Sequence, residues 1–479
     1  MRPYIIIRYL GFILLLNALF LLISAGIALF NNDSSFFPLL YTGIVALLFG
    51  IYPLMIIPTY EDITYSEGNT IVISGWLISC VIGAIPYIIW GGEFSITNAW
   101  FESVSGYTTT GASILTNVEA LPKGLLFWRA STHWIGGIGI IVFVLALLPS
   151  SNYSTLVLYR SEVSSVAMRQ FKMRSKDALN IIIYVYVGLT AAQTILLYLF
   201  GMNLLDSVSH SFATIATGGF STRNLSIAYY NDIWIESTIM IFMLLSGMNF
   251  ALLFAVVIGK FSSVKKSTVL KYYLLANLAG ILITALNVHG ANYESFWDSL
   301  RYSSFQILSV GTSTGFANAD SSVWPAFSQL VIIFFTLQCA CAGSTSGGIK
   351  TDRIIIFYKT LMRNIKRTIH PNAVFNIYID KQNVDETKVS VNNIFIITYL
   401  IIVLISTALL TLLNIDLLTS FSGTIAAMGN VGPGLGNVGS LENYSGLHYL
   451  GKWILSIVMI LGRLEIFGIV ILFFPKAWK

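Results

Sequence analysis

The stretch Ser105-Gly106-Tyr107-Thr108-Thr109-Thr110-Gly111-Ala112-Ser113 is a glycine-centred loop, rich in hydroxyl groups, between two long apolar runs. It is too polar to be part of an ordinary membrane-spanning helix. Loops of the same chemistry recur at 216–221, 313–317 and 430–434. Each follows a short segment that we predict to be a pore helix, and each precedes another apolar run. Four such loops in one chain favour a ring of backbone carbonyl oxygens, the arrangement from which cation filters are built.

The composition is that of a membrane protein with several spans. Of the 479 residues, 56% are hydrophobic and 10% are charged, whereas a soluble domain has about 25% charged residues. The N-terminal run 4–30 carries charge only at Arg8 and is longer than the apolar part of a signal peptide, so we expect a retained span. The net charge of +5 is interpreted as a topological signal. We expect membrane lipid around the chain and no nucleic-acid partner.

The order of the apolar runs predicts an all-α polytopic membrane protein built from repeats. Two runs, 4–30 and 37–57, precede the first loop and form two extra N-terminal transmembrane helices. Four parallel repeats follow around a central pore, each in the order long helix, pore helix, glycine loop, long helix. Long runs reach the ~20 apolar residues that cross a bilayer and pore segments do not, which makes about ten crossings. The predicted parts are 1–60 for the N-terminal extension and 61–150, 151–262, 263–372 and 373–479 for repeats 1 to 4.

The boundaries of the predicted elements follow the same pattern in every repeat. The pore segments are predicted at 95–107, 204–216, 293–310 and 416–428. The first long helices are predicted at 69–91, 178–201, 268–289 and 391–414. The second long helices are predicted at 123–149, 231–259, 323–342 (continuing after an interruption to about 371) and 447–474.

Lys and Arg cluster in connections that fall on one side of this topology. The positive-inside rule makes that side cytoplasmic, so we expect both termini in the cytoplasm and glycine loops that enter from outside. The acidic segment 58–68 argues weakly the other way, since acidic residues count little in the rule. The basic residues are Arg160, Arg169, Lys172, Arg174, Lys176, Lys260, Lys265, Lys266, Lys271, Lys350, Arg353, Lys359, Arg363, Lys366, Arg367, Lys476 and Lys479.

The four loops supply the oxygen ligands that a dehydrating cation needs. Irregular backbone at membrane depth is tolerated only where it lines a water-filled path or is buried in protein, and glycine lets successive carbonyls turn toward one axis. We place the repeat glycines at Gly111, Gly218, Gly315 and Gly432, each of the first three preceded by a threonine hydroxyl. The C-terminal ends of the pore helices would add partial negative charge. The candidate ion-binding residues are Thr109, Thr110, Gly111, Ala112, Thr217, Gly218, Gly219, Ser313, Thr314, Gly315, Phe316, Asn430, Val431, Gly432 and Pro433.

Several polar residues lie in or beside the pore segments. An ionised Glu102 is costly inside a membrane without a partner, and both a structural hydrogen-bonding role and a place near the ion path stay open. His133 is interpreted as a satisfied interfacial histidine. His210 and the pair Asp298 and Arg301 are interpreted as packing or solvated rim groups.

A second irregular segment, Ala342-Gly343-Ser344-Thr345-Ser346-Gly347-Gly348-Ile349-Lys350, breaks the second long helix of repeat 3. It is not a phosphate-binding loop, because an isoleucine separates the last glycine from the lysine and no strand precedes it. We interpret it as a constriction below the glycine loops. In the last helix, Arg463 is a functional-site hypothesis because arginine is costly at membrane depth, and a structural salt bridge with Glu465 stays open. The candidate gate residues are Gly343, Ser344, Thr345, Ser346, Gly347, Gly348, Lys350 and Arg463.

Taken together, these motifs resemble the bacterial TrkH/KtrB potassium-translocating subunits of the Trk/Ktr/HKT superfamily. The resemblance covers the four loops, the segment 343–350 and the segment 462–465, and so nearly the whole chain. The extra N-terminal helix pair makes it more similar to the TrkH branch. The resemblance implies a potassium uptake protein of the bacterial inner membrane, with K⁺ (and its analogue Rb⁺) passing a filter on a pseudo-fourfold axis. A glycine in all four loops is the K⁺-selective pattern of that family.

The same resemblance implies roles for particular residues and partners. The segment 343–350 would be an intramembrane gate, and Arg463 the nearby charge that restricts flow. Family members are homodimers on a cytosolic nucleotide-binding ring of TrkA type, so this chain would carry no cofactor of its own beyond the transported K⁺. The fourth loop departs most from the Thr-Gly form, as it does in relatives. The residues that would bind K⁺ are Thr110, Gly111, Thr217, Gly218, Thr314, Gly315, Val431 and Gly432.

Other function classes were weighed against K⁺ uptake. Obligate symport of K⁺ with H⁺ or Na⁺ would suit broken helices and an intramembrane Arg and Glu, although no chain of titratable residues crosses the bundle. A Na⁺-selective filter also stays open, since carbonyl rings do not reveal their ion in a sequence. We expect no enzyme, because the five histidines are scattered without an HExxH pattern. Cys80, Cys339 and Cys341 are expected to be small buried side chains rather than a disulfide framework.

Overall fold

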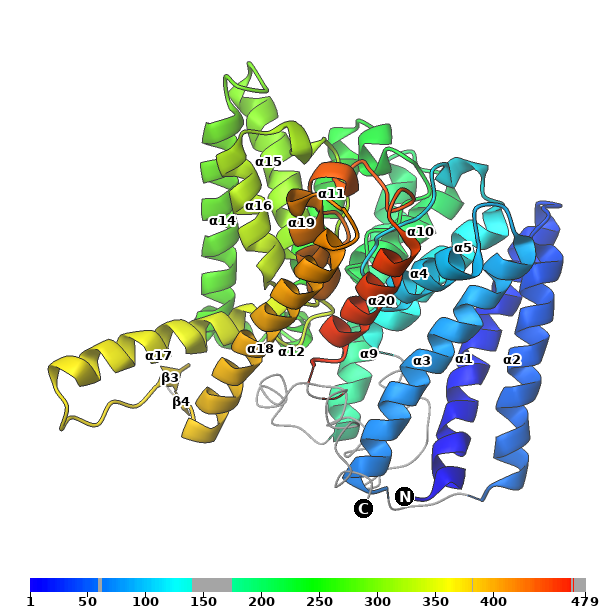
Figure 1. Cartoon of the computed structure of the whole chain (residues 1–479), viewed down its shortest axis with the longest axis horizontal. Helices are drawn as coiled ribbons and strands as arrows, with labels where there is room; N and C mark the ends of the chain where they lie inside the picture. The colour runs from blue at the N-terminus through cyan, green and yellow to red at the C-terminus, as the bar shows by residue number, and fades with distance from the viewer. Residues whose placement is uncertain (59–62, 140–174, 381, 467, 469–479) are drawn as a thin grey trace.

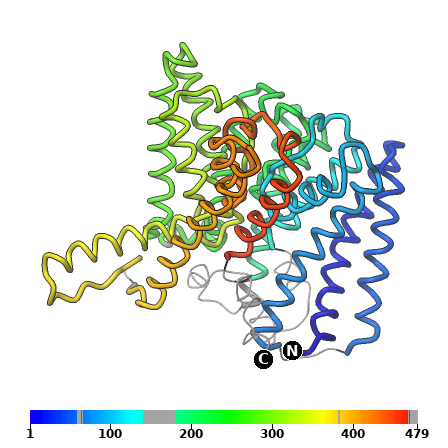
Figure 2. The backbone as a smooth tube through the Cα atoms, viewed as in Figure 1, coloured from blue at the N-terminus to red at the C-terminus, as the bar shows by residue number. Residues whose placement is uncertain are grey.

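The computed structural model describes residues 1–58, 63–139, 175–380, 382–466 and 468. Within these ranges the chain is mostly helical (Figure 1). The strands of the described ranges form two short pairs, β1 with β2 and β3 with β4. Figure 2 shows the backbone running from an N-terminal helix pair at one end of the molecule into a set of helices that surrounds a common centre. The predicted class, an all-α membrane protein, is confirmed.

The N-terminal extension is a helical hairpin of α1 (Pro3–Phe30) and α2 (Phe36–Ile56). Gly11 and Gly50 let the two helices approach closely, because a Cβ on either would lie within 3.0 Å of the carbonyl oxygen of the other. α1 also packs against α3 and α5. Asn17 on α1 accepts a hydrogen bond from the hydroxyl of Tyr107. The predicted extra helix pair is therefore present, and it supports the first pore helix from behind.

Four units follow, each in the predicted order of long helix, pore helix, glycine loop and second helix. Unit 1 consists of α3 (Tyr65–Trp90), α4 (Ile96–Tyr107), the 3-10 helix η1 (Val118–Ala120) and α5 (Lys123–Ile138). Unit 2 consists of α9 (Ser175–Leu199), α10 (Leu204–Ile215), η2 (Ser226–Tyr229), α11 (Ile233–Ser246), α12 (Phe250–Val257) and α13 (Phe261–Lys266).

Units 3 and 4 repeat the order with one insertion. Unit 3 consists of α14 (Thr268–Val288), α15 (Phe296–Gly311), η3 (Ser321–Val323), α16 (Ala326–Leu337), β1 (Gln338–Cys339), β2 (Ile349–Lys350) and α17 (Thr351–Ile369). The hairpin of β3 (Tyr378–Ile379) and β4 (Gln382–Asn383) leads into unit 4. Unit 4 consists of α18 (Glu386–Thr411), α19 (Leu417–Gly429), η4 (Gly436–Val438) and α20 (Tyr449–Arg463).

The units close into a ring because the second helix of each unit packs against the pore helix of the next. These pairs are α5 with α10, α11 with α15, α16 with α19, and α20 with α4. The last pair joins unit 4 back to unit 1. Four parallel repeats around one axis are therefore the architecture of the chain, as predicted.

The second helices of the units are shorter than predicted. By length and composition, the described helices able to cross a membrane are α1, α2, α3, α9, α14 and α18, and the bent pair α11 and α12 can be counted as one more. The described helical parts of α5, α16 and α20 have 16, 12 and 15 residues, fewer than the ~20 of a straight span. Residues 140–149, 467 and 469–474 of the predicted helices 123–149 and 447–474 lie outside the described residues.

The ends of α5 and α11 have residues that explain why the helical backbone stops there. α5 ends at Gly139, whose φ of 88° lies in the left-handed region. The prediction of one continuous helix over 231–259 is wrong: the chain bends by 108° between α11 and α12, and Asn249 caps the new helix with its side chain. The predicted interruption in unit 3 is present, because the chain leaves helix at Gln338 and re-enters it as α17.

Candidate functional site

The four pore helices begin in the same way, with a polar side chain that caps the first turn. These capping residues are Ser95 of α4, Asn203 of α10, Ser295 of α15 and Asp416 of α19. The backbone N–H of Thr419 lowers the pKa of the Asp416 carboxyl, so this cap carries a negative charge at neutral pH. Because the helices start at equivalent points, their C-terminal ends arrive at equivalent points around the axis.

Each pore helix ends in a Schellman motif, in which the residue after the helix has left-handed backbone angles. In α4 this residue is Thr109, with φ 54°. Its N–H donates to the carbonyl of Gly106 (3.1 Å), and the N–H of Thr110 donates to that of Ser105 (2.9 Å). The same bonds and a φ of 52–55° recur at Thr217, Ser313 and Asn430. A β-branched threonine is rare in this region, so the surrounding fold holds strained backbone here, as is typical of functional sites.

Two residues after the left-handed residue, each loop has a glycine that touches the next loop. The φ angles of these glycines, between 79° and 97°, are ones that other residues rarely adopt. A Cβ at any of the four would lie closer than 3.0 Å to a carbonyl oxygen of the next loop. The approaches run from Gly111 to Gly218, from Gly219 to Thr314, from Gly315 to Val431, and from Gly432 to Thr110. Loop 4 thus returns to loop 1, and the backbone of the four loops forms a closed ring.

The second loop differs in register from the prediction. Gly219, and not Gly218, has the left-handed φ and approaches the next loop. Gly218 instead takes the position that Thr110 takes in loop 1. Two adjacent glycines leave this register ambiguous in the sequence. In the structure the helix-ending turn falls at Thr217, Gly219 faces loop 3 and Gly218 faces His133. The placement of the second repeat glycine at Gly218 is therefore wrong by one residue.

Hydroxyl side chains tie two of the loops internally. Thr110 Oγ1 lies 2.8 Å from Thr108 Oγ1, and Thr314 Oγ1 lies 2.8 Å from Thr312 Oγ1. Loop 2 has Gly218 at this position and loop 4 has a valine. The layer of hydroxyl groups before the repeat glycines therefore has two members instead of the predicted three, because of the register of loop 2.

Loop 4 is held by groups from other segments. Asn430 donates from Nδ2 to Thr110 Oγ1 (3.1 Å) and to a carbonyl of α20 (3.0 Å). Tyr444 donates its hydroxyl to the carbonyl oxygen of Gly432 (2.6 Å). The backbone N–H of the same tyrosine donates to the carbonyl of Ser113 in loop 1 (2.8 Å). Tyr444 was missed by the sequence analysis, because nothing near it in sequence marks a contact with the ring.

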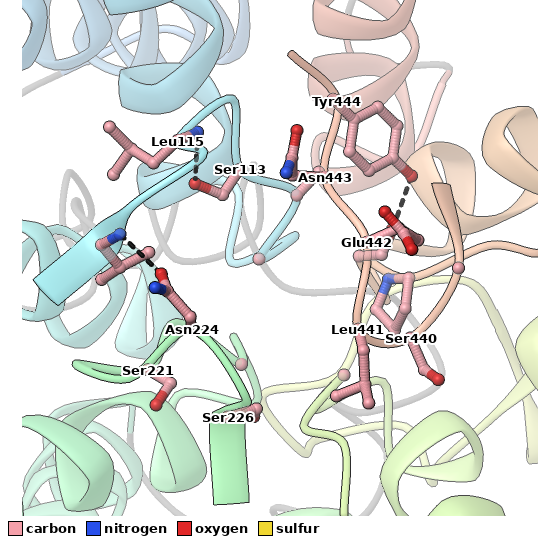
Figure 3. A pocket seen from close by; sticks show the side chains of 18 of the residues that line it. Ser113, Leu115, Ser221, Asn224, Ser226, Ser440, Leu441, Glu442, Asn443 and Tyr444 are labelled. Carbon is pink, nitrogen blue, oxygen red and sulfur yellow. Dashed lines mark hydrogen bonds between the residues drawn. The ribbon is translucent and has the colours of Figure 1, made fainter. Parts of the chain in front are cut away.

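A cavity of about 120 Å³ lies against one side of the ring. Its lining includes the four glycines Gly111, Gly219, Gly315 and Gly432. The remaining lining residues follow the glycines along the chain. Figure 3 shows one wall formed by Ser440, Leu441, Glu442, Asn443 and Tyr444, and the wall across from it formed by Ser113, Leu115, Ser221, Asn224 and Ser226. The ring is therefore open to a polar cavity on this side.

The intramembrane loop, residues 342–350, lies against the other side of the ring. The N–H of Gly347 donates to Ser313 Oγ (3.1 Å), and the hydroxyl of Thr345 donates to the last carbonyl of α10 (3.0 Å). A Cβ at Gly347 would lie closer than 3.0 Å to the last carbonyl of α19. These contacts are with residues that precede the repeat glycines, whereas the cavity is lined by residues that follow them. The ring thus separates the intramembrane loop from the cavity.

The bend between α11 and α12 holds one end of the intramembrane loop. Asn249 Nδ2 donates to the carbonyl of Ala342 (2.7 Å), and the N–H of Phe250 donates to the carbonyl of Gly343 (3.1 Å). β1 and β2 pair in parallel and close the loop at its base. The bend that the sequence analysis missed therefore has a clear role, since a straight helix would not present these donors to the loop.

Arg463 holds the tip of the intramembrane loop from the end of α20. Its guanidinium donates to the carbonyl oxygen of Thr345 (2.7 Å). It also donates to the carbonyl oxygens of Gly136 (2.7 Å) and Gly137 (3.0 Å) at the end of α5. One cation thus joins the second helices of units 4 and 1 to the loop.

Glu465 holds the other end of the intramembrane loop. Its carboxylate lies 2.6 Å from the guanidinium of Arg353 and 3.7 Å from Nζ of Lys350. Lys350 is the last residue of the loop, and Arg353 lies just after it in α17. Within the segment 463–465, Arg463 therefore contacts the tip of the loop, and Glu465 contacts its C-terminal end.

The comparisons with known proteins agree with this geometry. A sequence model of the TrkH family, described as a cation transport protein, matches residues 41–479. The chain belongs to the TrkH family. It is 33% identical to the Trk system potassium uptake protein TrkH of Escherichia coli K12 over 99% of both chains, and 34% identical to the TrkH of Salmonella typhimurium over 86% of both. The crystal structure of the potassium transporter TrkH from Vibrio parahaemolyticus superposes over 100% of both chains, with a TM-score of 0.90 and 31% identity.

One ion pair in this TrkH-family chain was missed by the sequence analysis. Glu102 in the first pore helix lies 2.6 Å from Nε of Arg129 on α5, and both side chains are buried. Glu102 also accepts hydrogen bonds from Ser113 Oγ (3.0 Å) and the N–H of Ile114 (2.9 Å). Arg129 also donates to the carbonyl of Ser221 (2.8 Å). The pair joins the outgoing ends of loops 1 and 2, which gives Glu102 a structural hydrogen-bonding role.

Arg301, which was interpreted together with Asp298 as a packing or solvated rim group, has a buried partner that the sequence did not indicate. Arg301 on the third pore helix pairs with Glu236 of α11 (2.6 Å), which is 1% exposed. Glu236 also accepts a hydrogen bond from Asn318, just after loop 3 (3.1 Å). His210 is buried and hydrogen-bonded, as expected of a packing group. The partners of these charges are distant in sequence, so no local pattern could have identified them.

The interpretation of His133 as a satisfied interfacial histidine is wrong. Its side chain is fully buried on α5 and stacks on Phe220 with 4.1 Å between the ring centroids. Among the described residues, neither ring nitrogen has a hydrogen-bond partner. His133 therefore belongs to the wall of the ring rather than to a membrane interface.

Proposed function

We propose that this chain is a potassium uptake protein that conducts K⁺ through the ring of glycine loops. Its relatives are named as potassium uptake proteins, and the structural neighbour is named as a potassium transporter. The observation that carries the proposal is the closed ring in which every repeat glycine approaches a carbonyl oxygen of the next loop. Backbone oxygens around one axis replace the water ligands of a dehydrating cation.

The proposed ligands are backbone oxygens at the positions named from the sequence, with one adjustment. The register of loop 2 moves its pair of ligands from Thr217 and Gly218 to Gly218 and Gly219. Four of these oxygens, on Thr110, Gly218, Thr314 and Val431, are the ones that the repeat glycines of neighbouring loops approach, which supports them as one layer of ligands. The pore helices direct their C-terminal ends to the ring, where partial negative charge favours a cation. The full proposed set is Thr110, Gly111, Gly218, Gly219, Thr314, Gly315, Val431 and Gly432.

In the same proposal the intramembrane loop is the gate of the pathway. It lies against the ring on the side away from the cavity, so an ion that passes the ring meets it next. Arg463 holds the loop at Thr345 and adds a positive charge that opposes a permeating cation. Opening requires the loop to leave these hydrogen bonds and the ion pairs of Glu465.

We further propose that both termini lie in the cytoplasm of a bacterium and that the chain works as a homodimer on a TrkA-type cytosolic ring. The basic helix α17 lies in the half of the molecule in which α1 begins (Figure 1), which fits the positive-inside rule. The relatives are named as proteins of a Trk system, which fits a partner subunit. The predicted basic residues Arg160, Arg169, Lys172, Arg174, Lys476 and Lys479 lie outside the described residues.

Flux into liposomes that contain only this purified chain tests the proposal. Rb⁺ or K⁺ uptake is measured with an imposed voltage, with competing Na⁺, and with or without a pH or Na⁺ gradient. Uptake that follows voltage and resists Na⁺ is the expected result, and Arg463→Ala should raise it. Uptake that requires a proton or sodium gradient would instead establish symport, and uptake that favours Na⁺ would refute the K⁺ filter.

A further inference from the structure

Loop 2 lacks a side chain where loop 1 has Thr110. The φ of Gly218 is not in the left-handed region, so its backbone conformation would accept a larger residue. A Cβ at Gly218 would, however, lie closer than 3.0 Å to Nδ1, Cγ and Cδ2 of His133. Glycine is therefore required at this position by the imidazole and not by the backbone.

The imidazole of His133 cannot easily move away. It comes from α5 and stacks on Phe220 at 4.1 Å with 17° between the ring planes. The guanidinium of Arg129, one helical turn earlier, lies 3.5 Å from the centroid of the same phenyl ring. Phe220 directly follows Gly219 of the ring. The stack of two α5 side chains on Phe220 thus fixes the imidazole directly behind the backbone of Gly218.

Gly218 is held between this imidazole and the neighbouring loop. Its carbonyl oxygen is the one that Gly111 approaches, and its Cα faces the ring of His133. Loops 1 and 3 are stiffened by pairs of threonine hydroxyls, and loop 4 by Asn430 and Tyr444. Loop 2 has Ala216 and Gly218 where loops 1 and 3 have the paired threonines.

We propose that His133 acts as the missing side chain of loop 2. Its imidazole fills the space that a threonine side chain fills in loops 1 and 3, and thereby positions the Gly218 carbonyl in the ring. It is a positioning residue that sets ion preference, and it does not touch the ion. Because protein interiors are packed without voids, removal of the imidazole leaves space into which the Gly218 carbonyl can turn. This inference rests on the proposed K⁺ pathway.

A size exchange between the two residues tests the inference. His133→Ala, Gly218→Thr and the double variant are reconstituted, with His289→Ala, an exposed histidine, as control. Gly218→Thr should lose Rb⁺ flux, because its side chain meets the fixed imidazole. His133→Ala should keep flux but lose about tenfold in preference for Rb⁺ over Na⁺, equivalent to about 1.4 kcal/mol. The double variant should recover both properties, because threonine then occupies the vacated space.

Three results would overturn the inference: native flux in Gly218→Thr, unchanged ion preference in His133→Ala, or a double variant no better than Gly218→Thr alone. The rescue shows that the defect of Gly218→Thr, whether in folding or in flux, comes from contact with the imidazole, since an unrelated defect would not be repaired by removing that side chain. The ion preference of the unmodified protein distinguishes failure of this inference from failure of the proposed function. If it shows no K⁺ preference, the proposed function fails; if it does and the exchange fails, only the role of His133 is refuted.

Discussion

Replacing Tyr444 with phenylalanine removes one hydrogen bond to the ring and little else. The hydroxyl of Tyr444 donates to the carbonyl oxygen of Gly432 at 2.6 Å, and the side chain is 2% exposed. Its ring packs against Phe101 with 5.5 Å between centroids, and phenylalanine keeps that contact. The backbone bond to loop 1 is also kept. Tyr444→Phe therefore isolates the effect of one donor on one carbonyl of the ring.

The magnitude follows from the burial of that carbonyl. A buried group that loses its partner costs about 1–3 kcal/mol. The Gly432 carbonyl can relieve this cost by turning toward an ion or water, and then it is no longer held at the spacing that suits K⁺. If about 1–2 kcal/mol of the preference for K⁺ over Na⁺ depends on this hydrogen bond, the variant loses about 5- to 30-fold in preference.

The assay is Rb⁺ uptake into liposomes in competition with Na⁺, at equal amounts of incorporated protein. Tyr449→Phe is the matched control, because Tyr449 lies five residues further along the chain and is 58% exposed. We expect a lower Rb⁺ preference in Tyr444→Phe and native behaviour in Tyr449→Phe. A preference in Tyr444→Phe within twofold of native would show that the hydroxyl does not hold the carbonyl, and the reasoning would be wrong.

Three further predictions concern the ion pair, the ring and the gate. Glu102→Gln leaves Arg129 charged and buried without its carboxylate, which costs about 3–5 kcal/mol, so the melting temperature in detergent should fall. It should fall less in the double variant Glu102→Gln with Arg129→Met, and equal melting temperatures of the two variants would contradict this. Gly219→Ala should abolish Rb⁺ flux because the φ of Gly219 is 79°. Gly188→Ala, where the added methyl group meets open space, should leave the flux unchanged. Native flux in Gly219→Ala would disprove the revised register. Glu465→Gln weakens the partly buried ion pair with Arg353, which is worth about 1 kcal/mol, so basal Rb⁺ flux should rise about fivefold with unchanged ion preference. A fall in flux would argue against the gate.

The pore helices and the intramembrane break could be predicted because their signals are local. Each repeat has a short segment with polar ends, then a glycine loop, then an apolar run, all within about 30 residues. The short segment stands out because it has fewer than the ~20 apolar residues of a membrane span. The predicted segment 204–216 and the helix α10 (Leu204–Ile215) differ by one residue at the C-terminal end. The break at 342–350 is equally local, since glycines, serines and a threonine replace apolar residues in the middle of a span.

The bend after α11 and the register of loop 2 could not be predicted in this way. Asn249 lies in an otherwise apolar run, and only its bond to the carbonyl of Ala342 explains why the helix turns there. Loop 2 has two adjacent glycines, Gly218 and Gly219. Which of them is the repeat glycine depends on which one faces loop 3 and which one faces His133. Both features are decided by segments that are 93 and 85 residues away in the chain.

The sequence by itself determined that this chain is a membrane protein of four glycine-loop repeats with a broken helix in the third. These properties depend on composition and on the spacing of apolar runs, which local physical chemistry translates directly into spans and loops. The tertiary structure alone decided how the loops meet: the closed ring, the partner of Glu102, the contacts of Arg463 and the place of His133. These depend on backbone approaches of a few ångströms between units about 100 residues apart, and such contacts leave no periodic pattern along the chain.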